Sequence, residues 1–143
     1  MAPTLKGSNI DQGDFVLTEK VSFWFRAPRR WEVITILRDD GARVVKRVVG
    51  LPGESVSMPN RGPLRIDGQI IEQPAAIADL RYLPYGNLLG TKPVPCNDGY
   101  YVLGDDTRDS DDSRFEGSIK AGRILGRTWL IIWPWERIGT VNP

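Results

Sequence analysis

The chain has 143 residues, enough for one domain with a buried core, and 41% of them are hydrophobic while 26% are charged. Its formal net charge is +1, so no broad electrostatic attraction to nucleic acid or to an anionic membrane is expected. The single Cys96 excludes an intrachain disulfide, and with 0 His there is no histidine base and no second ligand type for a zinc site. The longest apolar run, 129–133, is too short to span a bilayer, and no signal-peptide-like segment begins the chain, which as written is predicted to be soluble.

Short alternating apolar segments predict an all-β fold from the first half of the chain onward. Residues 15–17 form the first predicted strand, and 32–37 form the second. Asp40-Gly41 is a strong turn signal, so 32–37 and the following strand around Lys46 are predicted to pair as a hairpin.

The second half continues the pattern after a less regular stretch. Leu64 to Ile71 predicts another hairpin, with Asp67-Gly68 at its tip, and 100–103 and 124–133 are the last predicted strands. Between them, 73–83 is weakly helical with Pro74 in its first turn, and 84–98, rich in Gly, Pro and Asn, is predicted to be a long surface connection.

Lys46 is the residue with the clearest chemical potential. Side chains alternate along a strand, so Val44, Lys46 and Val48 should share one face. An amine between two valines is partly desolvated, which favours its neutral, basic form, and a hydrolase without histidine needs such a base. The alternative is a lysine whose stem packs on the strand while its head reaches water.

Five aspartates lie close together in the segment 104–114, directly after a predicted strand. Such a cluster needs compensating positive charge, which Arg108 and Arg114 could supply. A calcium loop is a competing interpretation, although the EF-hand pattern fails, because Arg114 occupies the position of the required glycine when the loop is counted from Asp109. The other two interpretations are a solvated acidic turn closed by such Asp–Arg pairs and a segment that supports catalysis.

Taken together, three segments resemble type I signal peptidases in their order and approximate spacing. They are the start Met1-Ala2-Pro3-Thr4-Leu5, the block 46–54, and the block 104–114. The ending 133–139 is also similar, so the resemblance covers nearly the whole chain. It implies a signal-peptidase-type β core of short antiparallel strands at 1–58 and 99–143, with a small inserted lobe at 59–98.

The resemblance also implies an activity and a set of roles. The family removes signal peptides from exported proteins through a serine–lysine dyad, without a cofactor and without nucleic acid, at the cell membrane with the catalytic domain on the extracytoplasmic side. Lys46 would be the general base, Ser110 would orient its amine, and Asp112 and Arg114 would form a supporting ion pair. The substrate would add as an extended strand, with its small side chains in pockets lined by Met1, Leu5, Val44 and Val45.

One departure from the family concerns the nucleophile. In the family the catalytic serine immediately precedes the methionine of the Met-x-Pro-Thr run, which here is Met1. The serine and the membrane anchor upstream of it are therefore missing from the chain as written, which is expected to be inactive. Either an active signal peptidase has lost its N-terminal part in this sequence, or the chain is a pseudoenzyme that binds exported peptides without cutting them. The retention of Lys46, Ser110, Asp112 and Arg114 favours the first hypothesis.

Overall fold

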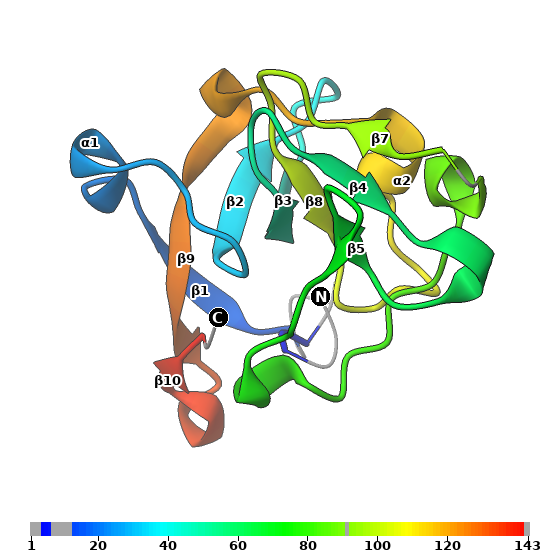
Figure 1. Cartoon of the computed structure of the whole chain (residues 1–143). Coiled ribbons are helices and arrows are strands. Elements are labelled where there is room, and N and C mark those ends of the chain that lie inside the picture. The colour runs from blue at the N-terminus through cyan, green and yellow to red at the C-terminus, as the bar shows by residue number, and fades with distance from the viewer. Residues whose placement is uncertain (1–3, 7–12, 91, 142–143) are drawn as a thin grey trace.

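The computed structural model describes residues 4–6, 13–90 and 92–141, and in these ranges the chain is mostly β (Figure 1). The strands are β1 Phe15–Glu19, β2 Val33–Leu37, β3 Arg43–Gly50, β4 Ser55–Ser57, β5 Arg65–Ile66, β6 Gln69–Ile70, β7 Val94–Pro95, β8 Tyr101–Leu103, β9 Ile124–Trp133 and β10 Gly139–Thr140. The helical turns are α1 Ser22–Phe25, η1 Pro59–Arg61, η2 Ala75–Ile77, η3 Gly86–Leu89, α2 Ser113–Glu116, η4 Ala121–Arg123 and η5 Trp135–Arg137. The all-β prediction is confirmed.

The larger sheet has the antiparallel order β1-β9-β2-β3-β8, with β10 also paired to β9. Its centre is the predicted hairpin of β2 and β3, in which Ile34 lies opposite Lys46. Gly41 adopts a φ of 83° at the predicted Asp40-Gly41 turn, a left-handed conformation that glycine tolerates without steric cost. The turn closes with a 2.8 Å hydrogen bond from the Arg38 amide to the Ala42 carbonyl.

The smaller sheet has the order β6-β5-β4-β7 and lies between β3 and β8 in the sequence. Its β5–β6 hairpin turns at Asp67 and Gly68, both with positive φ, as in the primed turns that suit tight hairpins. The sheet begins at β4, whose first residue lies four positions before the start of the expected lobe, and ends at β7. The boundaries 59 and 98 remain a proposal.

Two segments of the predicted lobe differ from expectation. Within 73–83 only η2 is helical, and Pro74 precedes it rather than filling its first turn. Ile77, Leu80 and Tyr82 are all buried, a spacing that one helical face could not provide. The segment 84–98 is not only a surface connection, since Leu88 and Cys96 in it are almost completely buried.

One apolar cluster joins the two sheets. It contains Val49 and Leu103 from the larger sheet, Val56 from the smaller sheet, and Leu88 and Cys96 from the intervening segment. Other clusters cover the two faces of the β2–β3 hairpin, one around Ile34 and Val48 and one around Val33 and Leu5. The hairpin that carries Lys46 is therefore packed on both faces.

Candidate active site

Lys46 lies on β3, which is rich in valine and so suits a strand packed on both faces. The cluster around Ile34 contacts both Val44 and Val48, which confirms that these two valines share the face to which Lys46 belongs. Burial lowers the pKa of the Lys46 amine below its usual value, against the opposing charges of Asp112 and Asp111. The site therefore shifts the amine toward its neutral form, compared with an exposed lysine.

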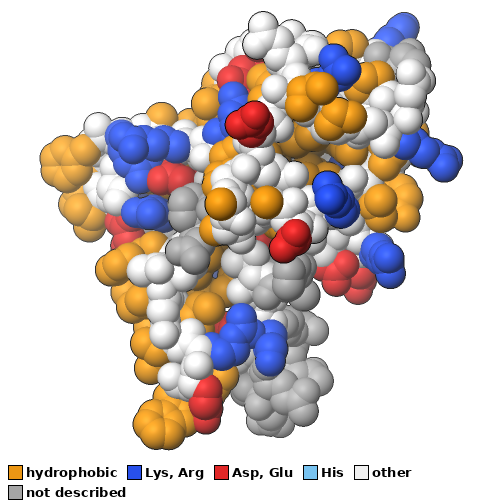
Figure 2. Space-filling model, turned by 60° about the horizontal axis from the view of Figure 1, so that its bottom comes forward, with side chains coloured by type: hydrophobic (Ala, Val, Ile, Leu, Met, Phe, Trp, Pro, Cys, Tyr) orange, Lys and Arg blue, Asp and Glu red, His pale blue; other side chains and the backbone are white. Residues whose placement is uncertain are grey.

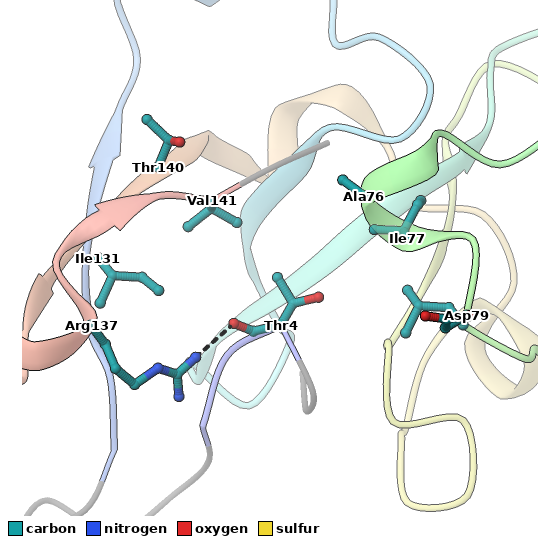
Figure 3. Close-up of a pocket in the computed structure, with 9 residues that line it drawn as sticks. Thr4, Ala76, Ile77, Asp79, Ile131, Arg137, Thr140 and Val141 are labelled. Atoms are coloured by element: carbon teal, nitrogen blue, oxygen red, sulfur yellow. Dashed lines mark hydrogen bonds between the residues drawn. The ribbon is translucent and has the colours of Figure 1, made fainter.

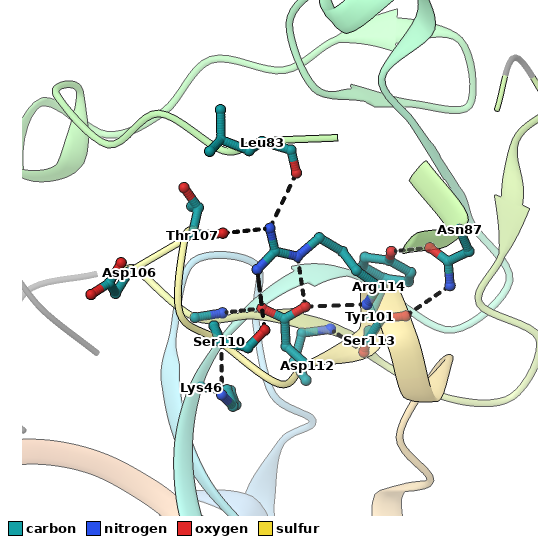
Figure 4. A network of polar contacts seen from close by, with 12 residues as sticks. Lys46, Leu83, Asn87, Tyr101, Asp106, Thr107, Ser110, Asp112, Ser113 and Arg114 are labelled. Carbon is teal, nitrogen blue, oxygen red and sulfur yellow. Dashed lines mark hydrogen bonds and ion pairs between the residues drawn. The ribbon is translucent and has the colours of Figure 1, made fainter. Parts of the chain in front are cut away.

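Ser110 faces the Lys46 amine, with a distance of 2.9 Å between Nζ and Oγ (Figure 4). The two residues are brought together because β8 runs beside β3 and the loop after β8 folds back over Lys46. Gly104 makes this approach feasible, since a Cβ atom there would lie 2.0 Å from the Ser110 Oγ and 3.6 Å from the Lys46 Nζ. The contact predicted from the sequence is present, and the orienting role remains a prediction.

Asp112 and Arg114 form a buried, bidentate ion pair directly behind Ser110. Arg114 Nε lies 2.8 Å from Asp112 Oδ1, and Nη2 lies 2.8 Å from Oδ2. Asp112 Oδ2 also accepts a hydrogen bond from the Gly104 amide at 2.9 Å. Burial alone would raise the pKa of Asp112, but Arg114 and the Gly104 amide stabilise the carboxylate and hold that pKa below its usual value.

Arg114 also fixes the path of the loop through its remaining donors. Its guanidinium donates to the carbonyl oxygens of Thr107 at 2.9 Å and Leu83 at 3.2 Å, and Ser110 at 3.4 Å (Figure 4). These bonds connect two positions of the Ser110 loop, and Leu83 of the neighbouring segment, to one buried cation. The ion pair is therefore in contact with the Ser110 loop, and its supporting role remains a prediction.

A second buried ion pair, Arg47 with Asp105, was not assigned any role from the sequence. Arg47 Nε and Nη2 lie 2.9 and 2.8 Å from the two Asp105 carboxylate oxygens, and both side chains are fully buried. Thr4 donates a hydrogen bond to Asp105 and accepts one from Arg47 at 3.2 Å. The pair therefore anchors Thr4 beside the strand that carries Lys46.

A signal for this pair was present in the sequence. Arg47 alternates with Lys46 in a valine-rich strand, so it had to point to the opposite, equally buried face. A buried guanidinium needs a carboxylate partner, and Asp105 follows the neighbouring strand. The sequence alone did not show that β3, which carries Arg47, pairs with β8, which precedes Asp105.

The acidic loop is compensated by arginines rather than arranged around a cation. Asp105 pairs with Arg47, Asp112 with Arg114, and Asp111 with Arg38 at 2.7 Å. Within residues 4–6, 13–90 and 92–141, no group of three or more His, Cys, Asp or Glu side chains is placed to hold a metal ion. This geometry gives the calcium interpretation no support.

The predicted substrate-binding residues divide between the two faces of β3. Leu5 and Val45 belong to one apolar cluster with Val33, whereas Val44 packs on the opposite face. Met1 lies outside the described residues. Among the described strands, β8 pairs with β3 only from Arg47 onward, so the same edge of β3 is unpaired at 43–46. An extended peptide could add to that edge beside Lys46.

A cavity of about 420 Å³ lies on another side of the N-terminal segment (Figure 3). Thr4 lines it together with Ile77 and Leu80 from the lobe and Ile131 and Val141 from the C-terminal region. Arg137 borders the cavity and donates a hydrogen bond to the Thr4 carbonyl at 3.2 Å. Neither Lys46 nor Ser110 lines it, so the cavity is separate from the lysine–serine contact.

The fold and site define a mostly β protein in which a partly desolvated lysine faces a loop serine, an arrangement suited to a lysine base. The family model described as signal peptidase, peptidase S26 matches residues 1–133. Signal peptidase I of Leptolyngbya laminosa is 32% identical over 154 residues, covering 100% of this chain and 69% of that protein. Probable signal peptidase I-2 of Synechocystis sp. is 31% identical over 149 residues, covering 99% of this chain and only 63% of that protein.

A crystal structure is also similar. Signal peptidase I from Enterococcus faecalis superimposes with a TM-score of 0.56 at 29% identity, covering 71% of this chain and 97% of that chain. The chain described here therefore belongs to the signal peptidase S26 family, the type I signal peptidases.

Proposed function

We propose that this chain is the catalytic domain of a serine endopeptidase that removes signal peptides from exported proteins. The observation that carries the proposal is the 2.9 Å contact between the Lys46 amine and Ser110, together with the burial that lowers the pKa of Lys46. Lys46 acts as the general base, Ser110 orients it, and the Asp112–Arg114 pair supports the loop. No cofactor is needed for this chemistry.

The nucleophile of the reaction is a serine directly before Met1 in the active protein. Thr4, three positions after Met1, supports this placement, because its bonds to Arg47 and Asp105 hold it next to β3. The chain described here supplies the base and its supporting loop.

The mechanism follows from the neutral amine. Lys46 takes the proton from the serine hydroxyl, whose oxygen attacks the scissile carbonyl to form a tetrahedral intermediate. Collapse of that intermediate breaks the peptide bond, and the lysine ammonium returns the proton to the leaving amine. A water molecule deprotonated by Lys46 then hydrolyses the acyl-enzyme. The substrate adds as a strand at 43–46, with small side chains near Leu5 and Val45.

The decisive experiment restores a serine-bearing segment before Met1 and measures cleavage of a preprotein after Ala-x-Ala. We expect cleavage by the extended protein and its loss, by at least about 10²-fold, in Lys46→Ala. Lys20→Ala removes an exposed lysine and serves as the matched control. Cleavage that survives Lys46→Ala would exclude the dyad. Intact mass and N-terminal sequencing of the protein from its own cells establish whether a serine precedes Met1 there.

A non-catalytic peptide-binding module is the second candidate, favoured only by the open edge of β3 at 43–46. Calorimetry with a signal-peptide fragment tests it. Binding without cleavage in the serine-extended protein would support this alternative, whereas cleavage would exclude it.

We also infer that the protein works at the extracytoplasmic side of the cell membrane. Within residues 4–6, 13–90 and 92–141, no helix has the length and apolar character of a membrane span. Exposed apolar side chains nevertheless follow one side of the molecule, along α1, β1, β9 and η5 (Figure 2). They include Phe15, Trp24, Phe25, Ile132, Trp133 and Trp135.

Aromatic side chains of this kind favour the membrane interface, which supports contact between this side and lipid. Trp31 does not belong to this exposed side, because it is buried in the core. The fraction of protein that sediments with vesicles of zwitterionic and anionic lipid should be lower for the double variant Trp24→Ser/Phe25→Ser than for the parent. Unchanged sedimentation would contradict the placement.

A further inference from the structure

Two aspartates follow Ser110 directly, and each has its own arginine. Asp112 points inward to Arg114, whereas Asp111 points outward to Arg38, with 2.7 Å between Arg38 Nη1 and Asp111 Oδ2. Consecutive side chains of an extended backbone point to opposite sides, which explains this division. The inward pair is part of the proposed site, while the outward pair has no role so far.

Arg38 connects three parts of the molecule. It lies at the end of β2, where the turn to β3 begins, and its Nη2 also lies 2.9 Å from Glu116 at the end of α2. A weaker contact of 3.6 Å joins its Nε to Asp40 in the turn. The loop that carries Ser110 and the helix that follows it are thus fastened to the hairpin that carries Lys46.

The contact between Arg38 and Asp111 also affects the charge around Lys46. The charged groups that act on the amine are Asp112 and Asp111, which favour the ammonium, and Arg38 and Arg114, which oppose it. Each carboxylate near Lys46 is therefore matched by an arginine. With both matched, burial dominates and lowers the pKa of the Lys46 amine.

We propose that Arg38 is a positioning residue for the reaction, which holds the Ser110 loop against the β2–β3 turn and offsets the charge of Asp111 beside Lys46. The inference rests on the proposed function, since it concerns the base of that reaction. It gives Arg38, which is more exposed than Arg114, a role that the buried Asp112–Arg114 pair does not have.

The test measures the titration of Lys46 in the 143-residue chain itself. Trace acetic anhydride labels neutral amines, and mass spectrometry of peptides gives the extent of labelling of Lys46 across neutral and alkaline pH. The other lysines, Lys6, Lys20, Lys92 and Lys120, are exposed and act as internal references. Because this readout does not need cleavage, its result is independent of whether the proposed peptidase activity is correct.

The two single variants should shift the pKa of Lys46 in opposite directions. Arg38→Gln removes a positive charge and leaves Asp111 unmatched, so the pKa of Lys46 rises and its labelling near neutral pH falls by about two- to fivefold. Asp111→Asn leaves Arg38 unmatched on that side, so the labelling increases by a similar factor. The double variant Arg38→Gln/Asp111→Asn should return close to the parent.

Arg123→Gln is the matched control, because Arg123 lies on the same surface but pairs with Asp39 and the Leu37 carbonyl. Its Lys46 labelling should equal that of the parent chain. A purely structural role for Arg38 would lower thermal stability without opposite shifts. Labelling of Lys46 that is unchanged in Arg38→Gln, or that moves the same way in both single variants, would overturn the proposal.

Discussion

At the scale of single residues, the site is built from groups whose burial is unfavourable for folding. Lys46 must lose part of its hydration to be a useful base, and its lowered pKa is the measure of that cost. Natural sites commonly keep such residues, because activity needs an arrangement that stability alone would not select. This free-energy cost of burying Lys46 can be tested by removing the amine and measuring the stability of the fold.

We expect Lys46→Met to stabilise the fold near neutral pH by about 0.5–2 kcal/mol, a usual range for relieving an unfavourable group. Methionine keeps the length of the stem and removes the ammonium. Because the folded-state pKa of Lys46 lies below its unfolded value, the unfolded chain binds more protons between the two values, and the parent gains stability as pH rises there.

The advantage of Lys46→Met should hence be largest below the folded pKa and disappear toward the ordinary lysine range. Urea unfolding at several pH values measures this dependence. Lys120→Met, at an exposed position, is the control and should show none of it. A pH-independent difference would mean that the amine is not desolvated.

At the scale of elements, β3 connects everything that the proposed site needs. Its first half pairs with β2 and presents Lys46, and its second half pairs with β8, from which the Ser110 loop departs. Its last residue, Gly50, is packed between the two sheets. A Cβ atom there would lie 2.6 Å from the Cys96 Sγ, 2.7 Å from Val56 Cγ2 and 2.9 Å from Tyr101 Cβ.

Gly50→Ala should therefore destabilise the protein by about 1–3 kcal/mol, since the added methyl overfills a closed junction. Thermal or chemical unfolding gives the difference. Gly122→Ala is the matched control, because a Cβ at Gly122 would meet nothing within 4 Å and its φ is not positive. That variant should stay within about 0.5 kcal/mol of the parent. Equal stability of the two variants would show that the junction relaxes freely.

At the scale of the whole molecule, local sequence signals predicted the elements but not their long-range partners. The alternation of valines and the two Asp-Gly turns predicted the hairpins correctly, because a strand and a tight turn are encoded within a few residues. The Arg47–Asp105 pair joins positions 58 apart, which no local periodicity encodes. The helix expected at 73–83 failed because burial of Tyr82 overrides a weak propensity.

The candidate site divides in the same way. The contact of Lys46 with Ser110 and the Asp112–Arg114 pair were expected from the family resemblance, and the structure brings these residues together, while their catalytic roles stay predictions. The segment 84–98 was expected on the surface from its glycines and prolines, yet Leu88 and Cys96 fill the junction between the sheets. The composition of a loop predicts its turns, but it does not predict which of its few apolar residues pack into the core.

The buried ion pairs also determine how the whole molecule responds to acid. The pKa of Asp112 is lowered in the folded state, so this group contributes stability that is present above its unfolded pKa and is lost as pH falls through the folded value. Asp112→Asn leaves Arg114 buried without its charge partner, which should cost about 3–5 kcal/mol near neutral pH. The difference from the parent should shrink in acid, where the parent carboxylate is protonated as well.

Urea unfolding of both proteins from neutral pH to strongly acidic pH follows this convergence. Asp109→Asn provides the control, because Asp109 is exposed in the same loop and should leave the acid profile unchanged. If Asp112→Asn were as stable as the parent at neutral pH, Arg114 alone would hold the loop and the ion pair would not support Ser110. Parallel profiles that never converge would instead place the loss in packing, because only a titrating carboxylate makes the two proteins alike in acid.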